Sequence, residues 1–241
     1  MFPIRDHNPS GRTPYVVYAL IAANVLVFLY QLPMMETREL FRFYDAWAMV
    51  PVEISNGVDL HTLVTSQFLH GGFMHIAGNM LFLWIFGDNM EDEMGHLGFL
   101  AFYLGCGVLA ALAQWAAAPM DRVPMVGASG AIAGVMGGYL LMFPKAEVDV
   151  LIFFRVVQLR AWVMLGLWFA FQIGNGAVDM DGTGGVAYWA HAGGFVVGAL
   201  ASLPIWLMRG GTGFWSRNDG HPPHPELPLI RSGVPKVPRK R

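Results

Sequence analysis

The chain has 241 residues, of which 55% are hydrophobic and only 13% are charged, and its formal net charge is −2. A soluble globular domain carries about 25% charged residues, so this composition indicates a protein whose solvent is mainly the lipid bilayer. The charge balance also argues against nucleic acid as a partner, because the basic residues concentrate in the C-terminal tail and not on one folded face.

Long apolar runs predict an all-α integral membrane protein, because a spanning helix needs about 20 residues. We expect six transmembrane helices in a single domain, with the fourth helix short enough to begin below the membrane surface. The expected spans are residues 14–32, 72–86, 96–118, 128–143, 161–177 and 186–207. They leave a leader at 1–13, a helical domain at 14–207 and a disordered, Pro-rich basic tail at 208–241.

The segments between the spans differ in character. The long first loop, 34–67, mixes charged and aromatic residues and suits the membrane interface. Two polar turns are expected, one from Gly87 to Gly95 with a helix-stopping glycine at each end, and one from Asp179 to Gly185. The loop between the fourth and fifth spans carries basic residues, namely Lys145, Arg155 and Arg160.

The positions of Lys and Arg set the expected orientation. Basic residues before the first span, after the sixth and in the loop after the fourth all fall on one side of a six-span protein. Cytoplasmic loops are enriched in Lys and Arg, so we expect both termini in the cytoplasm, in a multi-pass protein of a prokaryotic plasma membrane. The acidic turn after the second span, with Glu91, Asp92 and Glu93, does not fit, but acidic residues weigh little in this rule.

Few strongly polar residues interrupt the spans, and such residues need a partner or a function in lipid. Ser129 lies in Gly127-Ala-Ser-Gly130 at the start of the fourth span, and His191 opens the sixth. His75 and Asn79 lie four residues apart at the start of the second span, so they share one helix face. The topology therefore brings these side chains to a similar depth near the outer face.

Acyl transfer is the chemistry that needs these residue types. A serine hydroxyl becomes a good nucleophile when a neutral imidazole accepts its proton, which is the role we expect for Ser129 and His191. The tetrahedral intermediate needs hydrogen-bond donors for its oxyanion. The backbone N–H of Ser129, the Asn79 amide and the His75 imidazole are the candidates.

Small residues surround these positions and allow close helix packing. They include Gly127 beside the serine and two Gly-x-x-x-Gly pairs, Gly130 with Gly134 and Gly194 with Gly198. From spacing alone, a second interpretation stays open, in which the glycines only pack helices and His191 only bonds a carbonyl group.

Four blocks of sequence, in order, resemble the rhomboid family of intramembrane serine proteases. They are Phe68-Leu-His-Gly-Gly-Phe-Met-His-Ile-Ala-Gly-Asn-Met80, Gly87-Asp-Asn-Met-Glu-Asp92, Gly127-Ala-Ser-Gly130 and Ala190-His-Ala-Gly-Gly194 followed by Gly198. The resemblance covers residues 14–207. It implies a six-helix core, a Ser129–His191 dyad with no acidic third member, and an oxyanion site made by His75, Asn79 and the Ser129 N–H. It also implies hydrolysis of a peptide bond in or beside the transmembrane helix of a substrate protein.

The sequence departs from the family pattern at three places, none of which removes a catalytic group. Glu93 stands where relatives often carry Arg, and Ala133 replaces an aromatic residue that stacks on the histidine in some members. The Trp-Arg pair found in the first loop of some members is absent.

Other functions fit the sequence less well. A zinc intramembrane protease needs His-Glu-x-x-His, and no histidine here is followed directly by a glutamate. An aspartyl protease needs two intramembrane aspartate motifs, and Tyr44-Asp45 lies in a loop. A metal transporter using His70, His75 and His191 would leave the Ser129 block unexplained. The lone Cys106 excludes an internal disulfide, and we expect no metal or cofactor. The remaining alternative is a rhomboid-like pseudoprotease that binds and escorts membrane proteins without cleaving them.

Overall fold

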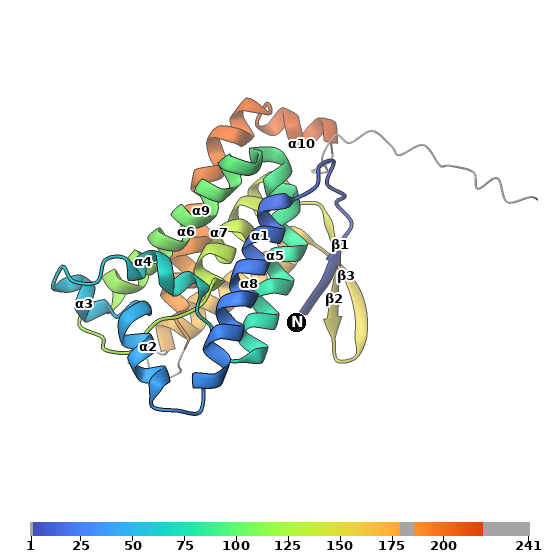
Figure 1. Ribbon diagram of the computed structural model, residues 1–241. Helices are drawn as coiled ribbons and strands as arrows, with labels where there is room; N and C mark the ends of the chain where they lie inside the picture. Colours follow the sequence, from blue (N-terminus) through green and yellow to red (C-terminus); the bar gives the residue numbers. More distant parts are fainter. Residues whose placement is uncertain (1, 179–185, 219–241) are drawn as a thin grey trace, which may run out of the picture.

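The computed structural model describes residues 2–178 and 186–218 (Figure 1). In chain order the elements are β1 (Phe2–Asp6), α1 (Tyr15–Gln31), η1 (Leu32–Met34), α2 (Glu39–Trp47), α3 (Pro51–Ser55), α4 (Thr62–Thr65), η2 (Ser66–Phe68), α5 (Phe73–Met94), α6 (His96–Ala117), α7 (Ser129–Met142), β2 (Glu147–Ile152), β3 (Arg155–Arg160), α8 (Ala161–Val178), α9 (Tyr188–Met208) and α10 (Thr212–Asn218).

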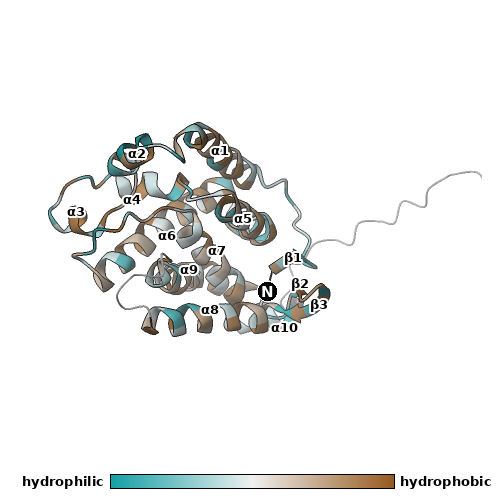
Figure 2. Cartoon of the chain, turned by 90° about the horizontal axis from the view of Figure 1, so that it is seen from below, coloured by the Kyte–Doolittle hydropathy of each residue, from teal (hydrophilic) through white to brown (hydrophobic). Residues whose placement is uncertain are grey.

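The protein is a helical bundle arranged around α7. Viewed along the bundle, α7 lies in the middle, with α5, α6, α8 and α9 around it and α1 beyond α5 (Figure 2). Ten of the 14 residues of α7 are buried, and it makes its most extensive contact with α9. A 14-residue helix is about 21 Å long, so α7 is too short to cross a hydrocarbon core of about 30 Å by itself. Its neighbours shield it from lipid along its length.

The six predicted apolar runs correspond to α1, α5, α6, α7, α8 and α9. Four described segments are long and apolar enough to cross a membrane individually: Tyr15–Met34, His96–Ala117, Ala161–Val178 and Tyr188–Met208. The segment Thr62–Phe68 together with α5 qualifies as a pair bent by 97°. The mostly helical membrane bundle is therefore confirmed, whereas length and composition do not by themselves fix the number of spans at six.

The predicted polar turn from Gly87 to Gly95 is wrong, because α5 continues to Met94. Gly87 is a packing residue: a Cβ there would lie 2.8 Å from Cγ2 of Val17 in α1. The acidic stretch serves as a cap, since the Glu91 carboxylate accepts the backbone N–H groups of Val16 and Val17 at 2.9 and 2.8 Å. These N–H groups in the first turn of α1 have no partner within their own helix. Only Gly95, with φ of 71°, ends a helix as expected.

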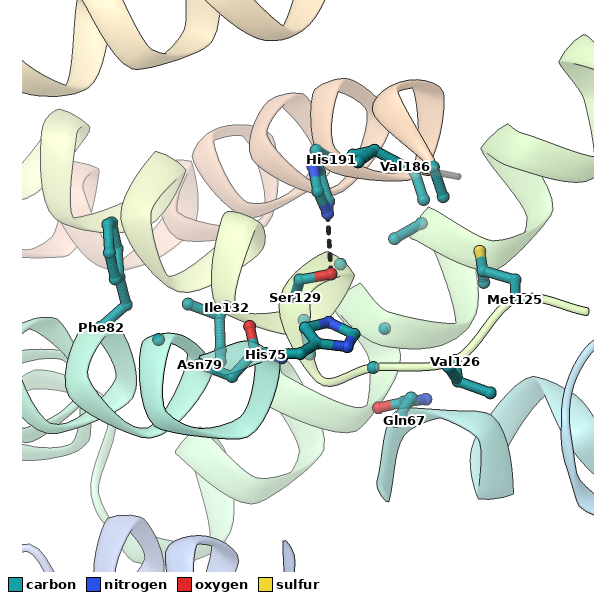
Figure 3. A pocket seen from close by; sticks show the side chains of 18 of the residues that line it. Gln67, His75, Asn79, Phe82, Met125, Val126, Ser129, Ile132, Val186 and His191 are labelled. Atoms are coloured by element: carbon teal, nitrogen blue, oxygen red, sulfur yellow. Dashed lines mark hydrogen bonds between the residues drawn. The ribbon is translucent and has the colours of Figure 1, made fainter. Parts of the chain in front are cut away.

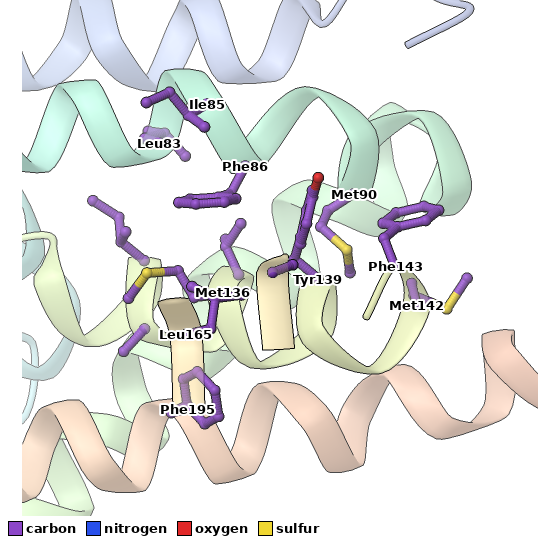
Figure 4. Close-up of a cluster of buried hydrophobic side chains, with 14 of the residues drawn as sticks. Leu83, Ile85, Phe86, Met90, Met136, Tyr139, Met142, Phe143, Leu165 and Phe195 are labelled. Atoms are coloured by element: carbon purple, nitrogen blue, oxygen red, sulfur yellow. The ribbon is translucent and has the colours of Figure 1, made fainter. Parts of the chain in front are cut away.

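Aromatic and methionine side chains fill the core between α5 and α7 (Figure 4). Tyr139 of α7 lies edge-on to Phe86 of α5, with ring centroids 5.0 Å apart, and to Phe143 at 5.2 Å. The Tyr139 hydroxyl donates a 2.7 Å hydrogen bond to Asp6 of β1. This bond ties the N-terminal strand to the helix that carries Ser129.

A three-stranded antiparallel sheet, in the order β1-β2-β3, lies beside the bundle (Figure 1). The sequence did not predict it, since 1–13 was expected to be a leader and the segment after the fourth span a loop. Phe2 pairs with Leu151, far along the chain, and Arg5 binds Asp149 at 2.7 Å. Strand pairing between such distant segments leaves no local pattern in the leader.

The ends of the expected segments also shift. Helix α10 forms from residues that were assigned to the disordered tail. The rest of that tail, 219–241, and the predicted turn at 179–185 lie outside the described residues. The first loop folds into the short helices α2, α3 and α4, which lie together on one side of the bundle (Figure 1).

Candidate active site

Three helices begin at the same end of the bundle, which we call the site end. Ser129 is the first residue of α7, His191 lies in the first turn of α9, and His75 lies in the first turn of α5 with Asn79 one turn later. All four side chains line one cavity of about 400 Å³ (Figure 3). The structure thus brings together the four side chains that the sequence analysis singled out.

Ser129 and His191 are in direct hydrogen-bond contact. The Ser129 hydroxyl lies 2.7 Å from Nε2 of His191, and the dashed line in Figure 3 marks this bond. The chain approaches Ser129 through Gly127, whose φ of 128° is in the range that side-chain-bearing residues rarely adopt. The Gly127 N–H donates to the Ser66 carbonyl at 2.9 Å, which fixes this turn against η2.

The other ring nitrogen of His191 also has a partner. Nδ1 lies 2.9 Å from Oε1 of Gln172, which belongs to α8 and is 5% exposed. The Trp168 ring, one turn earlier in α8, packs against the imidazole with centroids 5.9 Å apart. Sequence reasoning missed both residues. The criterion that identified the other site residues, a strongly polar residue inside an apolar span, would also have identified Gln172.

His75 and Asn79 place hydrogen-bond donors beside the serine. The Gly71 N–H donates to Nδ1 of His75 at 3.3 Å, so in a neutral His75 ring the proton is on Nε2. That nitrogen is directed at Gly127, where an added Cβ would lie 2.8 Å from it. Asn79 is 8% exposed, and its Nδ2 has no acceptor among the described residues.

The N-terminus of α7 adds a third donor, because the first N–H groups of a helix have no intrahelical partner. The Ser129 N–H is the first of them. An oxygen atom bonded to a carbon that Ser129 attacks would develop its negative charge beside this N–H and the positive end of the α7 dipole.

The predicted packing glycines bring α7 and α9 into backbone contact. A Cβ at Gly194 would overlap the Gly130 carbonyl oxygen, and a Cβ at Gly198 would overlap the backbone of Gly134. Gly137 makes a similar approach to the Phe195 carbonyl, which the sequence analysis did not single out. This close approach is what allows a side chain as short as serine to reach the histidine on the next helix.

His70 does not join the cavity. It is fully buried and stacks edge-on against His75 with ring centroids 5.0 Å apart. Its backbone N–H and carbonyl bond the Gln31 side chain of α1, so its segment is fixed to that helix. Among residues 2–178 and 186–218, no group of three His, Cys, Asp or Glu side chains is arranged to hold a metal ion.

The family model described as the Rhomboid domain matches residues 58–207, which is more than half of the chain. The chain belongs to the rhomboid family. Its membership rests on the segment that contains α5 to α9 and all four cavity residues named above.

Named relatives come from organelles and from bacteria. Rhomboid protein 1, mitochondrial, of Saccharomyces cerevisiae is 31% identical over 191 residues, which are 77% of this chain and 51% of the yeast protein. Rhomboid-like protein 11, chloroplastic, of Arabidopsis thaliana is 29% identical over 215 residues, 85% of this chain and 69% of the plant protein. The putative rhomboid protease YdcA of Bacillus subtilis is 32% identical over 129 residues, 54% of this chain and 62% of that protein.

This chain therefore spans about half the length of the yeast relative. The family and the apolar helices show a multi-pass integral membrane protein, and the protease-named relative supports an intramembrane protease. The relatives do not support the expected assignment to a prokaryotic membrane, because they include mitochondrial and chloroplast proteins.

Proposed function

We propose that the protein is a serine endopeptidase that cleaves transmembrane helices of other membrane proteins through a Ser129–His191 dyad and an acyl-enzyme. The 2.7 Å contact between the Ser129 hydroxyl and Nε2 of His191, inside a cavity, carries this proposal. The membership of the rhomboid family supports it.

In the proposed reaction, the Ser129 oxygen attacks the substrate carbonyl carbon while its proton passes to Nε2 of His191. The carbonyl oxygen becomes negative and accepts hydrogen bonds from His75, Asn79 and the Ser129 N–H. As the C–N bond breaks, His191 returns the proton to the leaving amine, and the acyl group stays on Ser129. His191 then takes a proton from water as the hydroxide attacks the ester carbon. The bond from that carbon to the Ser129 oxygen breaks, His191 returns the proton to this oxygen, and the carboxylic acid product leaves.

The substrate helix must unwind before it can react. Each carbonyl in a transmembrane helix is hydrogen-bonded within the helix, so Ser129 reaches one only after local opening. Gly or Pro in the substrate lowers that cost, by about 1 and 3 kcal/mol relative to Ala in soluble helices. Gly130 and Ala190 are among the residues that line the cavity, which favours small residues such as Ala or Ser just before the cut bond.

The proposal includes an orientation with both termini in the cytoplasm and the site end near the outer face. A reporter that works only in the cytoplasm should then be active when fused after Arg241 and inactive when inserted near Asn56 in the first loop. The reverse pattern would place the site end toward the cytoplasm.

The test of the function is cleavage of a transmembrane reporter by purified protein in lipid vesicles. Wild type should cleave a span that contains Gly or Pro and should cleave an uninterrupted poly-Leu span far more slowly. Ser129→Ala, His191→Ala and the double variant should all be inactive to about the same extent, because the two residues act as one unit. Cleavage by Ser129→Ala would refute the dyad. A folded wild type that binds the reporter without cutting it would identify an escort protein instead.

A further inference from the structure

We propose that Gln172 is a positioning residue that holds His191 in the tautomer that accepts the Ser129 proton, with Trp168 fixing the plane of the ring. This inference rests on the proposed function. It gives residues of α8 a role in orienting the catalytic histidine, whereas a dyad of Ser129 and His191 involves α7 and α9 alone.

The chemistry sets one requirement on His191. Its Nε2 must carry a lone pair toward the Ser129 hydroxyl, so in the neutral ring the proton must be on Nδ1. A free imidazole exchanges this proton between its two nitrogens, and the form protonated at Nε2 would donate to the serine oxygen and be unable to act as base. An acceptor at Nδ1 selects the competent form.

The Gln172 side-chain oxygen is such an acceptor, at 2.9 Å from Nδ1. Gln172 is 5% exposed, so water competes little for this bond. All proton transfers of the proposed reaction, to and from Ser129, the leaving amine and water, take place at Nε2. The Nδ1–H bond to Gln172 therefore persists in the neutral ring and in the imidazolium, and a neutral amide dipole takes the place that a carboxylate has in a three-residue arrangement.

Trp168 lies one turn before Gln172, so the two residues share a face of α8. Its ring is tilted by 36° to the His191 ring, with centroids 5.9 Å apart, and by 33° to Phe195 at the same distance. Ala133 of α7, one turn after Ser129, is fully buried, and its methyl group provides no aromatic ring to pack on His191. The imidazole is therefore oriented from α8, by one hydrogen bond at its edge and one aromatic ring at its face.

The decisive variants are Gln172→Leu and Gln172→Glu. Leucine has nearly the same volume but no acceptor, so kcat should fall roughly 10-fold or more while KM stays near the wild-type value, the loss that one buried hydrogen bond represents. Glutamate offers an oxygen at the same reach, whether or not it is ionised, and should restore most of kcat. Trp168→Leu should lower kcat less than Gln172→Leu.

Gln114→Leu is the matched control. Gln114 of α6 also bonds α9 near the site, but it accepts the Ala190 backbone N–H at 3.2 Å and is not bonded to the His191 ring. It should change thermal stability without a selective loss of kcat. Gln172→Leu that is folded and as active as wild type, or Gln172→Glu as inactive as Gln172→Leu, would overturn the proposal. Equal kcat losses in the Leu variants of Gln172 and Gln114 would do the same. None of these outcomes would refute the proposed Ser129–His191 dyad. The cleavage assay with Ser129→Ala tests the dyad separately.

Discussion

The two ends of the bundle differ in the polar groups that they gather. At the end opposite the site, carboxylates meet donors: Glu91 accepts two N–H groups of α1, Asp88 accepts the Ser10 hydroxyl at 2.9 Å, and Glu93 pairs with Arg209 at 2.7 Å. At the site end, donors converge on a cavity, and the Asn79 amide nitrogen has no acceptor among the described residues.

This difference distinguishes polar groups that support the fold from polar groups that would serve the proposed reaction. A buried polar group without a partner destabilises a protein, so the pairing of buried carboxylates with donors at the end opposite the site supports the fold. Donors gathered around a cavity reduce stability and are useful only when an oxygen atom with developing charge occupies it. The comparison predicts that substitutions at the opposite end lower stability and that substitutions at the site end lower kcat.

The largest effect should come from the seam that joins α7 to α9. Gly198→Ala places a Cβ into the backbone of Gly134, which neither helix can avoid without moving apart. We expect a loss of about 3 kcal/mol or more, with activity lost as the Ser129–His191 bond opens. Gly105→Ala in α6 is the control, because its Cβ would meet no atom within 4 Å. Thermal melting in detergent measures both, and a Gly198→Ala protein with wild-type stability would contradict the close packing.

Asn79→Ala should lower kcat by roughly 10² to 10³ with a smaller change in KM, because the bond to an oxyanion strengthens only in the transition state. Melting should change little. Asn89 provides the control from the same helix, since its amide donates to the Asn8 carbonyl at 2.6 Å at the opposite end. Asn89→Ala should be less stable and retain its kcat. If the two variants exchanged these effects, the comparison between the ends would fail.

Glu91→Ala should lower the free energy of unfolding by about 2 kcal/mol, because two N–H groups of α1 lose a charged acceptor. The kcat of the folded protein should not change. The exposed Glu36 in the first loop serves for comparison, and its alanine variant should lie within about 0.5 kcal/mol of wild type. A selective loss of kcat in Glu91→Ala would show that this end takes part in catalysis.

A further effect should be a pH dependence of stability at Asp6. Burial raises the pKa of this carboxyl to about 7, partly opposed by the hydrogen bond from Tyr139. The folded protein therefore favours the protonated form, and its contribution to stability is present below pH 4 and is lost as the pH rises toward 7. Asp6→Asn keeps an acceptor and has no charge to gain. Its melting temperature should exceed that of wild type by an amount that grows from pH 4 to pH 7, whereas parallel curves would show that Asp6 titrates normally.

The helical bundle and the proximity of Ser129 and His191 were predictable because each depends on a strong local signal. Apolar runs of spanning length stand out in any membrane protein, and residues such as Ser129 and His191 are rare inside them. The helix starts then place them at one depth without any knowledge of packing.

Features that depend on partners far along the chain were not predictable. Gly87 resembles a helix stop, and only its contact with Val17 shows that it packs two helices. The strand at the N-terminus exists because residues 147–152 pair with it. Gln172 carried a usable signal, yet its role depends on the bond to His191, which lies on another helix.

The most direct test of the account is labelling by an active-site-directed fluorophosphonate, which forms a bond with a serine oxygen only when a base has activated it. Wild-type protein in detergent should be labelled at Ser129, and both Ser129→Ala and His191→Ala should lose the label while remaining folded. Labelling that persists in a folded His191→Ala protein, or a wild type that takes no label, would contradict a Ser129–His191 catalytic pair.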